Sequence, residues 1–380
     1  MYNLKILNEI ESGKWDNDLV NCEYSNFFQS AEYLLSESGA DKFPIFIYVT
    51  DEFGDPKGQM GIIVHKSPLI YSANILKIFA KIFSKLGNRI TWVCGPIIHS
   101  NDKNSRIEIL HAMIKALDTI SEKHNVILID GYTPPQDVTI DEFYIDEFRK
   151  NNYNVTNFFT FVTNLSKSEE EIWSSLNKNA QRDVTRSQKL NISVRELGYD
   201  QLDQFFLISE KWAQTKGIVK SISKLAKERY WDYYKKGVEK VFLAYEDNEM
   251  VASHRLGCFN RIAYSHSLIN SYTKEGTLGG PVLTWHALQW AKKERMRIYD
   301  FSGGEAAPID ADEFEKYDKQ WSSLLAYKRK WGGEEFPYFH VVKVRKKFAY
   351  KVMRVLLKID WRYRNFKKKK YERTSIARTD

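Results

Sequence analysis

Cysteine is scarce in this sequence. Three occur among 380 residues, Cys22, Cys94 and Cys258, and no CxxC pair is present. The spacing therefore argues against a zinc cluster and a disulfide framework, and it favours a reducing, cytoplasmic compartment. Long apolar runs are missing too, because no uncharged stretch exceeds 16 residues, and 151–166, which has that length, is rich in Asn and Thr. The opening residues contain no apolar signal-peptide core, so we expect neither a secretion signal nor a membrane span.

Three common catalytic signatures are also absent, namely GxSxG, HExxH and GxxxxGK[ST]. Their absence argues against a serine hydrolase, a zinc hydrolase and a P-loop NTPase. The eight histidines are scattered. His254 and His266 lie on adjacent predicted strands. We favour side chains that hydrogen-bond within the protein over a pair of metal ligands there. We expect no metal and no permanently bound cofactor.

Charge of one sign is concentrated near the C-terminus. Residues 343–380 contain 15 Lys or Arg and 3 Asp or Glu. The other 342 residues contain 42 Lys or Arg and 46 Asp or Glu, so the body of the chain is mildly acidic. Apolar residues recur in 343–380 at helical spacing: Phe348, Val352, Val355, Leu356 and Ile359. The pattern predicts a basic amphipathic helix. Three interpretations stay open: packing of the apolar face on the body, attachment to an anionic membrane surface, and contact with RNA phosphates.

The body of the chain predicts the same order of elements twice. Apolar residues make up 43% of the chain and aromatic residues 14%, enough for a sizeable core. The first half predicts strands at 43–50 and 61–65, helices over 75–86 and 107–120, and a strand at 126–130. The second half predicts strands at 241–246, 251–259 and 261–271, a helix at 281–295, and a strand at 297–301. We therefore expect two similar α+β domains.

The predicted division is a first domain at 1–152, a second domain at 153–336, and a basic helix and tail at 337–380 that packs back on the first domain. Between the halves, 166–189 reads as one helix, with Ser166 or Ser168 as its N-cap. Arg182 and Arg186 are four residues apart and share a face of that helix.

Four segments carry the strongest family signal. They are FFQS at 27–30, WSSLNKNAQRDVTR at 173–186, YDFSGG at 299–304 and AYKRKWGG at 326–333. In this order and spacing they resemble the FemABX family of peptidyltransferases, whose broader relatives are GNAT-like acyltransferases. The resemblance runs from Phe27 to Gly333. It implies two tandem GNAT-like domains with mixed or antiparallel sheets flanked by helices, which agrees with the repeated pattern.

The resemblance also implies an activity. Relatives transfer an aminoacyl group to an amine, often of a peptidoglycan precursor peptide, and the donor in well-known members is aminoacyl-tRNA. The chain is accordingly expected to be an aminoacyl- or acyltransferase of cell-envelope biosynthesis, cytoplasmic or peripheral at the inner face of the membrane. Its co-substrate would be aminoacyl-tRNA or acyl-CoA, and its acceptor a lipid-linked or nucleotide-linked precursor.

Lys328 occupies the position of the lysine in the family's late turn, which is thought to stabilise charge during transfer. A cation beside Tyr327 and Trp331 is partly desolvated and suits a developing oxyanion. The simpler interpretation is a surface lysine in a basic turn. Asp300 ends a predicted buried strand, where it would accept the amine proton or fix the turn that follows.

The resemblance assigns further residues to substrate. Arg182 and Arg186 match a basic helix that faces phosphates in relatives, and the alternative is a solvated helix face. The predicted substrate channel is bordered by Tyr264, His266 and Asn270, with Tyr327 beside it. Gln29 matches the opening glutamine of the family, where a structural role is an alternative. A cleft between the domains is expected to hold Arg182, Arg186, Asp300 and Lys328.

The sequence departs from the family pattern in two places. Residues 31–38 lack the lysine that relatives using a nucleotide-linked precursor carry, which argues against that acceptor. The stretch 188–241 is too short for the helical arm of some members, so a tRNA donor is less secure unless the basic tail replaces the arm.

Two other functions stay open. In an acyl-CoA-dependent N-acyltransferase, Gly279 and Gly280 would lie at the helix start that holds pyrophosphate, although the usual preceding Arg or Gln is missing. These glycines also serve simply to begin the helix, with Pro281 in its first turn. The third function is a non-catalytic scaffold or membrane-surface binding protein.

Overall fold

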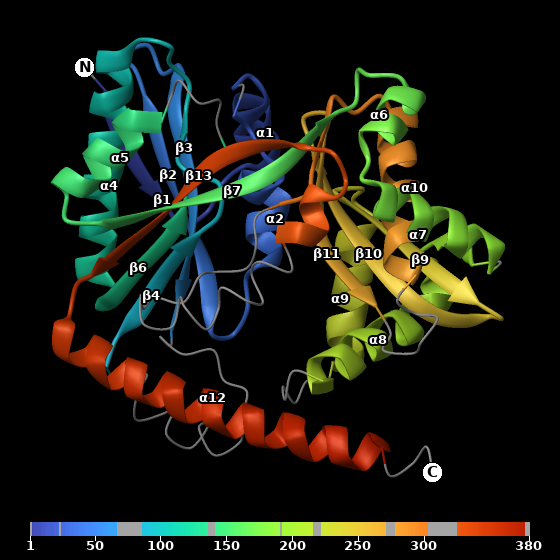
Figure 1. The fold of residues 1–380 in the computed structure, drawn as a ribbon. Coiled ribbons are helices and arrows are strands. Elements are labelled where there is room, and N and C mark those ends of the chain that lie inside the picture. Colours follow the sequence, from blue (N-terminus) through green and yellow to red (C-terminus); the bar gives the residue numbers. More distant parts are fainter. Residues whose placement is uncertain are drawn as a thin grey trace. The chain divides into compact units, whose positions relative to one another are not determined.

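The computed structural model describes residues 2–22, 24–66, 86–135, 141–190, 192–215, 222–270, 278–302 and 325–376. The predicted helix at 75–86 lies outside these residues except for its last position, as do Gly303 and Gly304. The chain divides into two compact units. Unit 1 comprises 1–159 and 336–363, and unit 2 comprises 160–335 and 364–380. Each unit is a mixed sheet flanked by helices (Figure 1), which confirms the predicted α+β fold class.

Unit 1 has the strand order β1-β2-β3-β4-β6-β13. Its strands are β1 (Asn3–Leu7), β2 (Lys42–Thr50), β3 (Pro56–His65), β4 (Asn88–Trp92), β5 (Ile97–Ile98, beside β3), β6 (Val126–Tyr132) and β13 (Glu334–Val344). Its helices are α1 (Ser12–Val20), η1 (Phe27–Gln29), α2 (Ala31–Ser36), α4 (Lys103–Lys123) and α5 (Asp141–Lys150). β4 and β6 pair in parallel, so the chain must cross over between them, and α4 provides that crossover.

Alternating side chains divide between the two faces of the unit 1 sheet. On β2, Ile45 and Ile47 enter the core under α4 and α5, whereas Phe46 packs with Trp15 of α1 and Leu34 of α2. This is the period-2 alternation expected of a strand buried on both faces. Figure 1 shows α4 and α5 on one side of this sheet and α1 and α2 on the other.

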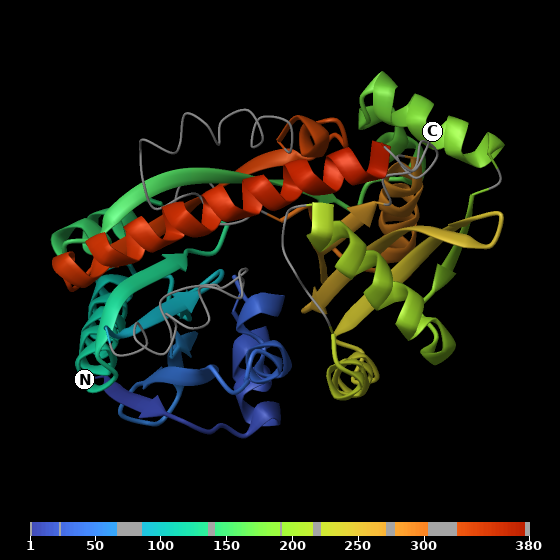
Figure 2. The same cartoon turned by 90° about the horizontal axis from the view of Figure 1, so that it is seen from below.

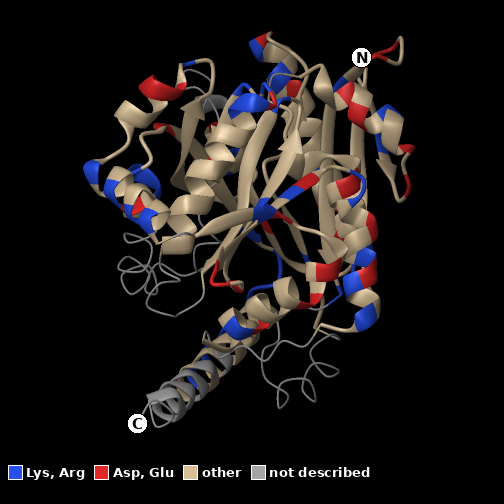
Figure 3. Ribbon diagram, turned by 90° about the vertical axis from the view of Figure 1, so that its right-hand side faces the viewer, with Lys and Arg blue, Asp and Glu red and all other residues tan. Residues whose placement is uncertain are grey.

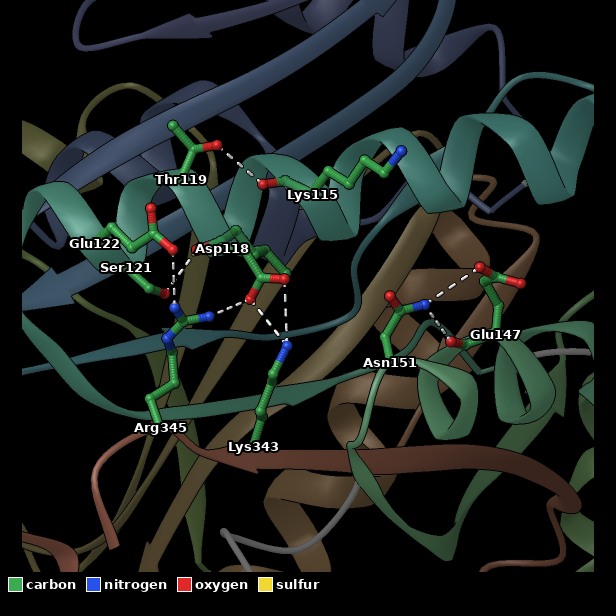
Figure 4. Close-up of polar contacts among 10 residues, drawn as sticks. Lys115, Asp118, Thr119, Ser121, Glu122, Glu147, Asn151, Lys343 and Arg345 are labelled. Atoms are coloured by element: carbon green, nitrogen blue, oxygen red, sulfur yellow. Dashed lines mark hydrogen bonds and ion pairs between the residues drawn. The ribbon is translucent and has the colours of Figure 1, made fainter.

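α4 packs one face in the unit 1 core and binds basic residues at the end of β13 with another face. Its N-cap is Asp102, whose carboxylate accepts a hydrogen bond from the Ser105 amide at 2.8 Å. The predicted apolar stripe is confirmed, because Leu110, Ile114, Leu117 and Ile120 are buried. On another face of α4, Asp118 accepts hydrogen bonds from Lys343 (2.9 Å) and Arg345, and Arg345 also reaches Glu122 (Figure 4). The first basic residues of the C-terminal segment are therefore used inside unit 1.

Unit 2 repeats this topology with the strand order β7-β12-β11-β10-β9-β8. Its strands are β7 (Asn154–Asn164, which enters unit 2 at Thr160), β8 (Ser193–Glu196), β9 (Glu239–Glu246), β10 (Glu249–Phe259), β11 (Ile262–Asn270) and β12 (Ile298–Asp300). Its helices are α6 (Glu169–Ser175), α7 (Lys178–Lys189), η2 (Tyr199–Gln201), α8 (Leu202–Thr215), α9 (Lys224–Tyr234) and α10 (Gly279–Lys293). β11 and β12 pair in parallel and α10 lies between them in sequence, as α4 does between β4 and β6. The predicted tandem plan is confirmed.

The helices of unit 2 cover opposite faces of its sheet (Figure 2). Phe242 and Ala244 of β9 enter the core that includes α7 and α10, whereas Leu243 and Tyr245 enter a smaller core with α8 and α9. We call these the α10 face and the α8 face.

The predicted single helix at 166–189 is wrong, because the segment forms α6 and α7. Ser168 begins α6 in a capping box with Glu171. Asn177 begins α7, since its side chain accepts a hydrogen bond from the Asn179 amide at 2.8 Å. A second N-cap inside the segment requires an extended residue, and the backbone of Asn177 is extended (φ −60°, ψ 145°).

α12 (Lys347–Ile376) is the predicted basic C-terminal helix. Ala349 and Met353 are buried, whereas Phe348, Val355 and Ile359 are exposed. The apolar stripe is therefore only partly covered by protein. Figure 3 shows Lys and Arg recurring along this helix. Among the described residues, no helix is both long enough and apolar enough to cross a bilayer.

Candidate functional site

One row of in-register residues crosses the unit 2 sheet. Glu239 of β9 pairs with Gly257 of β10, Gly257 with Tyr264 of β11, and Tyr264 with Asp300 of β12. Residues in register on neighbouring strands point to the same face. Along β9, the even-numbered residues Phe242 and Ala244 face α10, so the odd-numbered residues, Glu239 among them, face α8. The structure therefore brings Tyr264 and Asp300 together on the α8 face.

Asp300 is held at the end of β12 by two donors. Its Oδ1 accepts hydrogen bonds from the hydroxyl of Thr160 on β7, at 2.5 Å, and from the backbone amide of Ser302, at 2.7 Å. Ser302 has a left-handed backbone (φ +57°), which turns the chain just after the strand. Burial raises the pKa of Asp300, and the bonds from Thr160 and Ser302 and the charge of Lys328 oppose that rise.

Lys328 points to the same turn. Its Nζ donates to the carbonyl oxygen of Ser302, and the residue is only 8% exposed. Burial lowers the pKa of Lys328 to about 8, although the Asp300 carboxylate favours the charged form. The ammonium is therefore a desolvated cation that titrates close to neutral pH.

The turn that carries Lys328 is fixed by aromatic packing. The Tyr327 hydroxyl is 3.0 Å from the Thr284 hydroxyl on α10, and its ring lies 6.0 Å from the fully buried ring of Trp331. Burial raises the pKa of Tyr327 to about 12, so it stays neutral. Gly332 has φ +73°, and a Cβ there would lie 2.5 Å from the carbonyl oxygen of Ser175. Only glycine fits this close approach to α6.

Arg182 and Arg186 lie on the exposed face of α7, whose other face buries Ala180 and Val184. The Arg182 side chain is 72% exposed and lies 3.8 Å from the carboxylate of Asp183. α7 is tied to the Lys328 turn by a different pair, since Lys330 reaches Asp183 at 3.3 Å. The packing of α7 and α10 together in the core of the α10 face separates these two arginines from the Asp300 row.

Gly279 and Gly280 begin α10 against the sheet. A Cβ on Gly279 would lie 2.7 Å from the Cβ of Ala252, and one on Gly280 would lie 2.8 Å from the amide of Asn270. A side chain at Gly279 would therefore clash with β10, whereas one at Gly280 requires only that the end of the Asn270 side chain move. Asn270 ends β11 beside this helix start, away from Asp300 along the strand. Leu278, at the N-cap position, provides no side-chain cap.

Gln29 is a buried residue of unit 1. Its amide donates to the carbonyl of Val93 at 2.8 Å, and its Oε1 accepts from the amide of Gly61 at 2.7 Å. The side chain thus joins η1 to β3 and to the end of β4. This geometry fits the structural alternative.

Sequence reasoning missed a polar cluster on the α8 face. Glu239 receives hydrogen bonds from Arg255, Tyr230 and His266. His254 is on the other face, with its Nε2 2.9 Å from the Ser265 hydroxyl. The two histidines therefore do not converge, and among the described residues no group of three or more His, Cys, Asp or Glu is placed to hold a metal. Thr160 was also missed, because only the pairing of β7 with β12 brings it to Asp300.

The fold is that of the tandem GNAT-like class. A crystal structure of FemX matches 92% of this chain and 99% of its own chain, with a TM-score of 0.65 at 12% identity. The structure of L-PGS from Bacillus licheniformis matches 92% of this chain and 98% of its own, with a TM-score of 0.54 at 12% identity. At these identities the likeness establishes the fold.

A family match comes from the sequence. Residues 145–268 match the model of the FemAB family, and they include the motif at 173–186. The resemblance expected from the motifs is confirmed by this match, which covers about a third of the chain. No curated protein matches the chain by sequence.

Proposed function

We propose that this protein transfers an aminoacyl group from aminoacyl-tRNA to an amine of a cell-envelope precursor, of the peptidoglycan-peptide type or a related glycan. The observation that carries the proposal is the Lys328 ammonium, buried beside Asp300 and held on the carbonyl of Ser302. The match of residues 145–268 to the FemAB family model and the fold shared with FemX support it.

The proposed reaction needs no covalent enzyme intermediate. The acceptor nitrogen attacks the ester carbonyl carbon, a C–N bond forms, and the C–O bond to the tRNA ribose breaks. The proton lost by the amine ends on the leaving ribose oxygen. Lys328 stabilises the negative charge that develops on the carbonyl oxygen, because a desolvated cation is most effective there. Asp300 keeps Lys328 charged and positioned, and Tyr264 and Tyr327 border the reacting groups.

Two basic surfaces are proposed to hold the polyanionic donor. Arg182 and Arg186 present exposed guanidinium groups on α7, which suit phosphate oxygens. The second surface is the basic C-terminal segment, of which Lys343 and Arg345 are already paired with α4. The run Lys367–Lys370 is therefore the better choice for mutation.

A donor-binding experiment tests the proposal. We would titrate the full-length protein with aminoacyl-tRNA and, separately, with acetyl-CoA, at low salt and at about 0.2 M salt. Saturable tRNA binding that weakens with salt, and weakens further when Lys367–Lys370 are changed to Gln, supports the proposal. Binding of acetyl-CoA alone contradicts the donor assignment. Binding of neither favours the non-catalytic scaffold.

An acyl-CoA-dependent N-acyltransferase is the second candidate. The observation that favours it is the N-terminus of α10, where Leu278, at the N-cap position, provides no side-chain cap. Uncapped amides at a helix start attract pyrophosphate oxygens. Gly280→Ser is a direct probe, because it places a side chain at this helix start. Loss of acetyl-CoA binding in this variant, with tRNA binding absent from the wild type, would establish the second candidate.

We also propose that the protein acts in the cytoplasm, peripheral to the inner face of the membrane. Phe348, Trp361 and Phe366 of α12 are exposed apolar residues on a helix rich in Lys and Arg. Such a helix suits an anionic surface, where each basic residue contributes about 1 kcal/mol. Co-sedimentation with vesicles of phosphatidylglycerol, but not phosphatidylcholine, is expected. Equal partitioning to both would contradict the electrostatic account.

A further inference from the structure

Glu239 is a fully buried carboxylate with three hydrogen-bonding partners. Its side chain is 0% exposed. Its Oε1 accepts from Arg255 Nη2 at 2.7 Å and from His266 Nδ1 at 2.9 Å, and its Oε2 accepts from the Tyr230 hydroxyl at 3.0 Å. A buried carboxylate costs several kcal/mol unless it is paired, and these partners satisfy that requirement.

The charge of Glu239 is fixed. Burial alone would raise its pKa, but Arg255 and His266 outweigh burial and lower the pKa to about 2. Glu239 therefore stays ionised throughout the working range of an enzyme. A carboxylate that does not exchange protons is suited to orient its neighbours, as in carboxylate–histidine pairs at other catalytic sites.

A β-bulge turns His266 toward this carboxylate. Between β10 and β11, Arg255 pairs with Ser267 and Leu256 pairs with Ser265, so His266 is the extra residue. Bulges re-aim a side chain that regular alternation would send elsewhere. Ser265 points to the α10 face, where it bonds His254, and His266 points to the α8 face, where it bonds Glu239.

The bulge also places His266 beside the Asp300 row. Tyr264 is in register with Asp300, and His266 lies two residues further along β11, which is roughly 7 Å. β12 ends at Asp300, and the chain continues to Ser302, whose carbonyl receives Lys328. The backbone of His266 is therefore level with the turn whose carbonyl receives Lys328. The His266 side chain is 26% exposed, whereas Asp300 is 5% exposed and its Oδ1 already accepts two hydrogen bonds.

From this arrangement we infer that His266 is the catalytic base of the proposed transfer and that Glu239 is its positioning residue. This inference rests on the proposed function. With Nδ1–H donated to Glu239, the basic nitrogen of the ring is Nε2. His266 Nε2 takes the proton from the acceptor amine as the C–N bond forms, and then returns it to the leaving oxygen as the C–O bond breaks. The base is regenerated and no other reactant is needed.

Among the described residues, the charged and titratable groups of the Glu239 cluster come from three elements. They are Glu239 on β9, Arg255 on β10, and Tyr230, Tyr233 and Tyr234 on α9. Burial raises the pKa values of Tyr230 and Tyr234 above their ordinary range, so these groups stay neutral. Glu239 is therefore the anion of this cluster that contacts the His266 imidazole.

Ring-nitrogen NMR on full-length protein labelled with 15N-histidine tests the positioning step without any substrate. The His266 signal is identified by its disappearance in His266→Gln. The expected wild-type spectrum shows the Nδ1–H form, and Glu239→Gln shifts the His266 signal toward a mixture of forms. Glu196→Gln is the matched control, because Glu196 is a carboxylate on β8 that bonds Lys240 and Tyr234. It should leave the His266 signal unchanged. An Nε2–H form in the wild type would overturn the inference.

The rate of transfer tests the base role. His266→Gln should lower kcat by about 10²–10⁴-fold. Glu239→Gln should lower kcat as well, and Glu239→Asp should restore it, because the shorter carboxylate again orients the imidazole. An active wild type with an unchanged kcat in His266→Gln overturns this inference alone. A wild type inactive with every donor overturns the proposed function as well.

Discussion

Asp130 of unit 1 and Asp300 of unit 2 occupy equivalent positions in the two sheets. Each lies on the strand that pairs in parallel with its neighbour, with Thr91 opposite Asp130 and Tyr264 opposite Asp300. Each Oδ1 is bonded by a residue of the strand on its other side. That partner is His340 at 2.7 Å in unit 1 and Thr160 at 2.5 Å in unit 2.

The repeated plan therefore places a buried carboxylate at the same point with different partners. In unit 1 the partner imidazole stacks on Tyr132, with ring centroids 4.6 Å apart. In unit 2 the carboxylate faces Lys328, which approaches from the later turn. We place the proposed chemistry in unit 2 because its buried carboxylate faces a lysine, whereas that of unit 1 is bonded to a histidine.

Replacing Lys328 with Met should lower kcat by about 10²–10³-fold, because the developing oxyanion loses its cation. KM should change little, since the charge develops only in the transition state. Arg329→Gln is the matched control, because Arg329 is the next residue and its side chain is exposed and paired with Glu335. Steady-state kinetics decide the point, and an equal loss in both variants would contradict the role of Lys328.

The rate of transfer should fall as pH rises through about 8. Burial lowers the pKa of Lys328 to about 8, so the ammonium is present below that pH and lost above it. Lys328→Arg should extend activity to higher pH, because a guanidinium stays charged. A rate that is flat from pH 7 to pH 9 would mean that the charge of Lys328 is not used.

Asp300→Asn should move the alkaline limb to lower pH. The Asp300 carboxylate raises the pKa of Lys328 against the effect of burial, and the amide removes that support. The measurement is the pH–rate profile of the variant beside that of the wild type. A limb that moves to higher pH would show that Asp300 does not stabilise the ammonium.

Gly332→Ala should destabilise the protein more than Gly237→Ala. Both glycines have left-handed backbones, at φ +73° and φ +77°. That conformation costs a non-glycine residue about 1–2 kcal/mol. At Gly332 the new Cβ also meets the Ser175 carbonyl, whereas at Gly237 nothing lies within 4 Å. Thermal unfolding compares the two variants, and equal shifts in Tm would argue against the close approach of this turn to α6.

The double variant Arg182→Gln, Arg186→Gln should weaken binding of every tRNA to a similar extent, whatever its sequence. The dependence of log affinity on log salt should become shallower by about 1–2 units, as expected when two phosphate contacts are lost. Stability should stay close to that of the wild type, since both side chains are exposed. An unchanged salt slope would assign these arginines to a solvated face.

Local pattern predicted the elements that bury a regular stripe. Apolar periodicity located β2, α4 and α10, and the four motifs pointed to the turn that holds Lys328. Periodicity failed where a local signal competed with it. Asn177 is an N-cap inside a helical pattern, and it divides α6 from α7.

The remaining features depend on pairing between distant segments. β13 was not predicted, because its place in unit 1 depends on β6, about 200 residues earlier in the sequence. The contact between Thr160 and Asp300 joins residues 140 positions apart. The Glu239 cluster requires the register of three strands and one bulge, which no linear motif records.

The most direct test of the central claim is the bond that the enzyme forms. Full-length protein would be incubated with tRNA charged with radiolabelled amino acids, and with lipid-linked or nucleotide-linked envelope precursors in separate reactions. The account predicts label on a precursor that resists mild alkali, because an amide survives conditions that hydrolyse the tRNA ester. The label should disappear in Lys328→Met and persist in Arg329→Gln. Label that remains alkali-labile, or that never leaves the tRNA with any precursor, would contradict it.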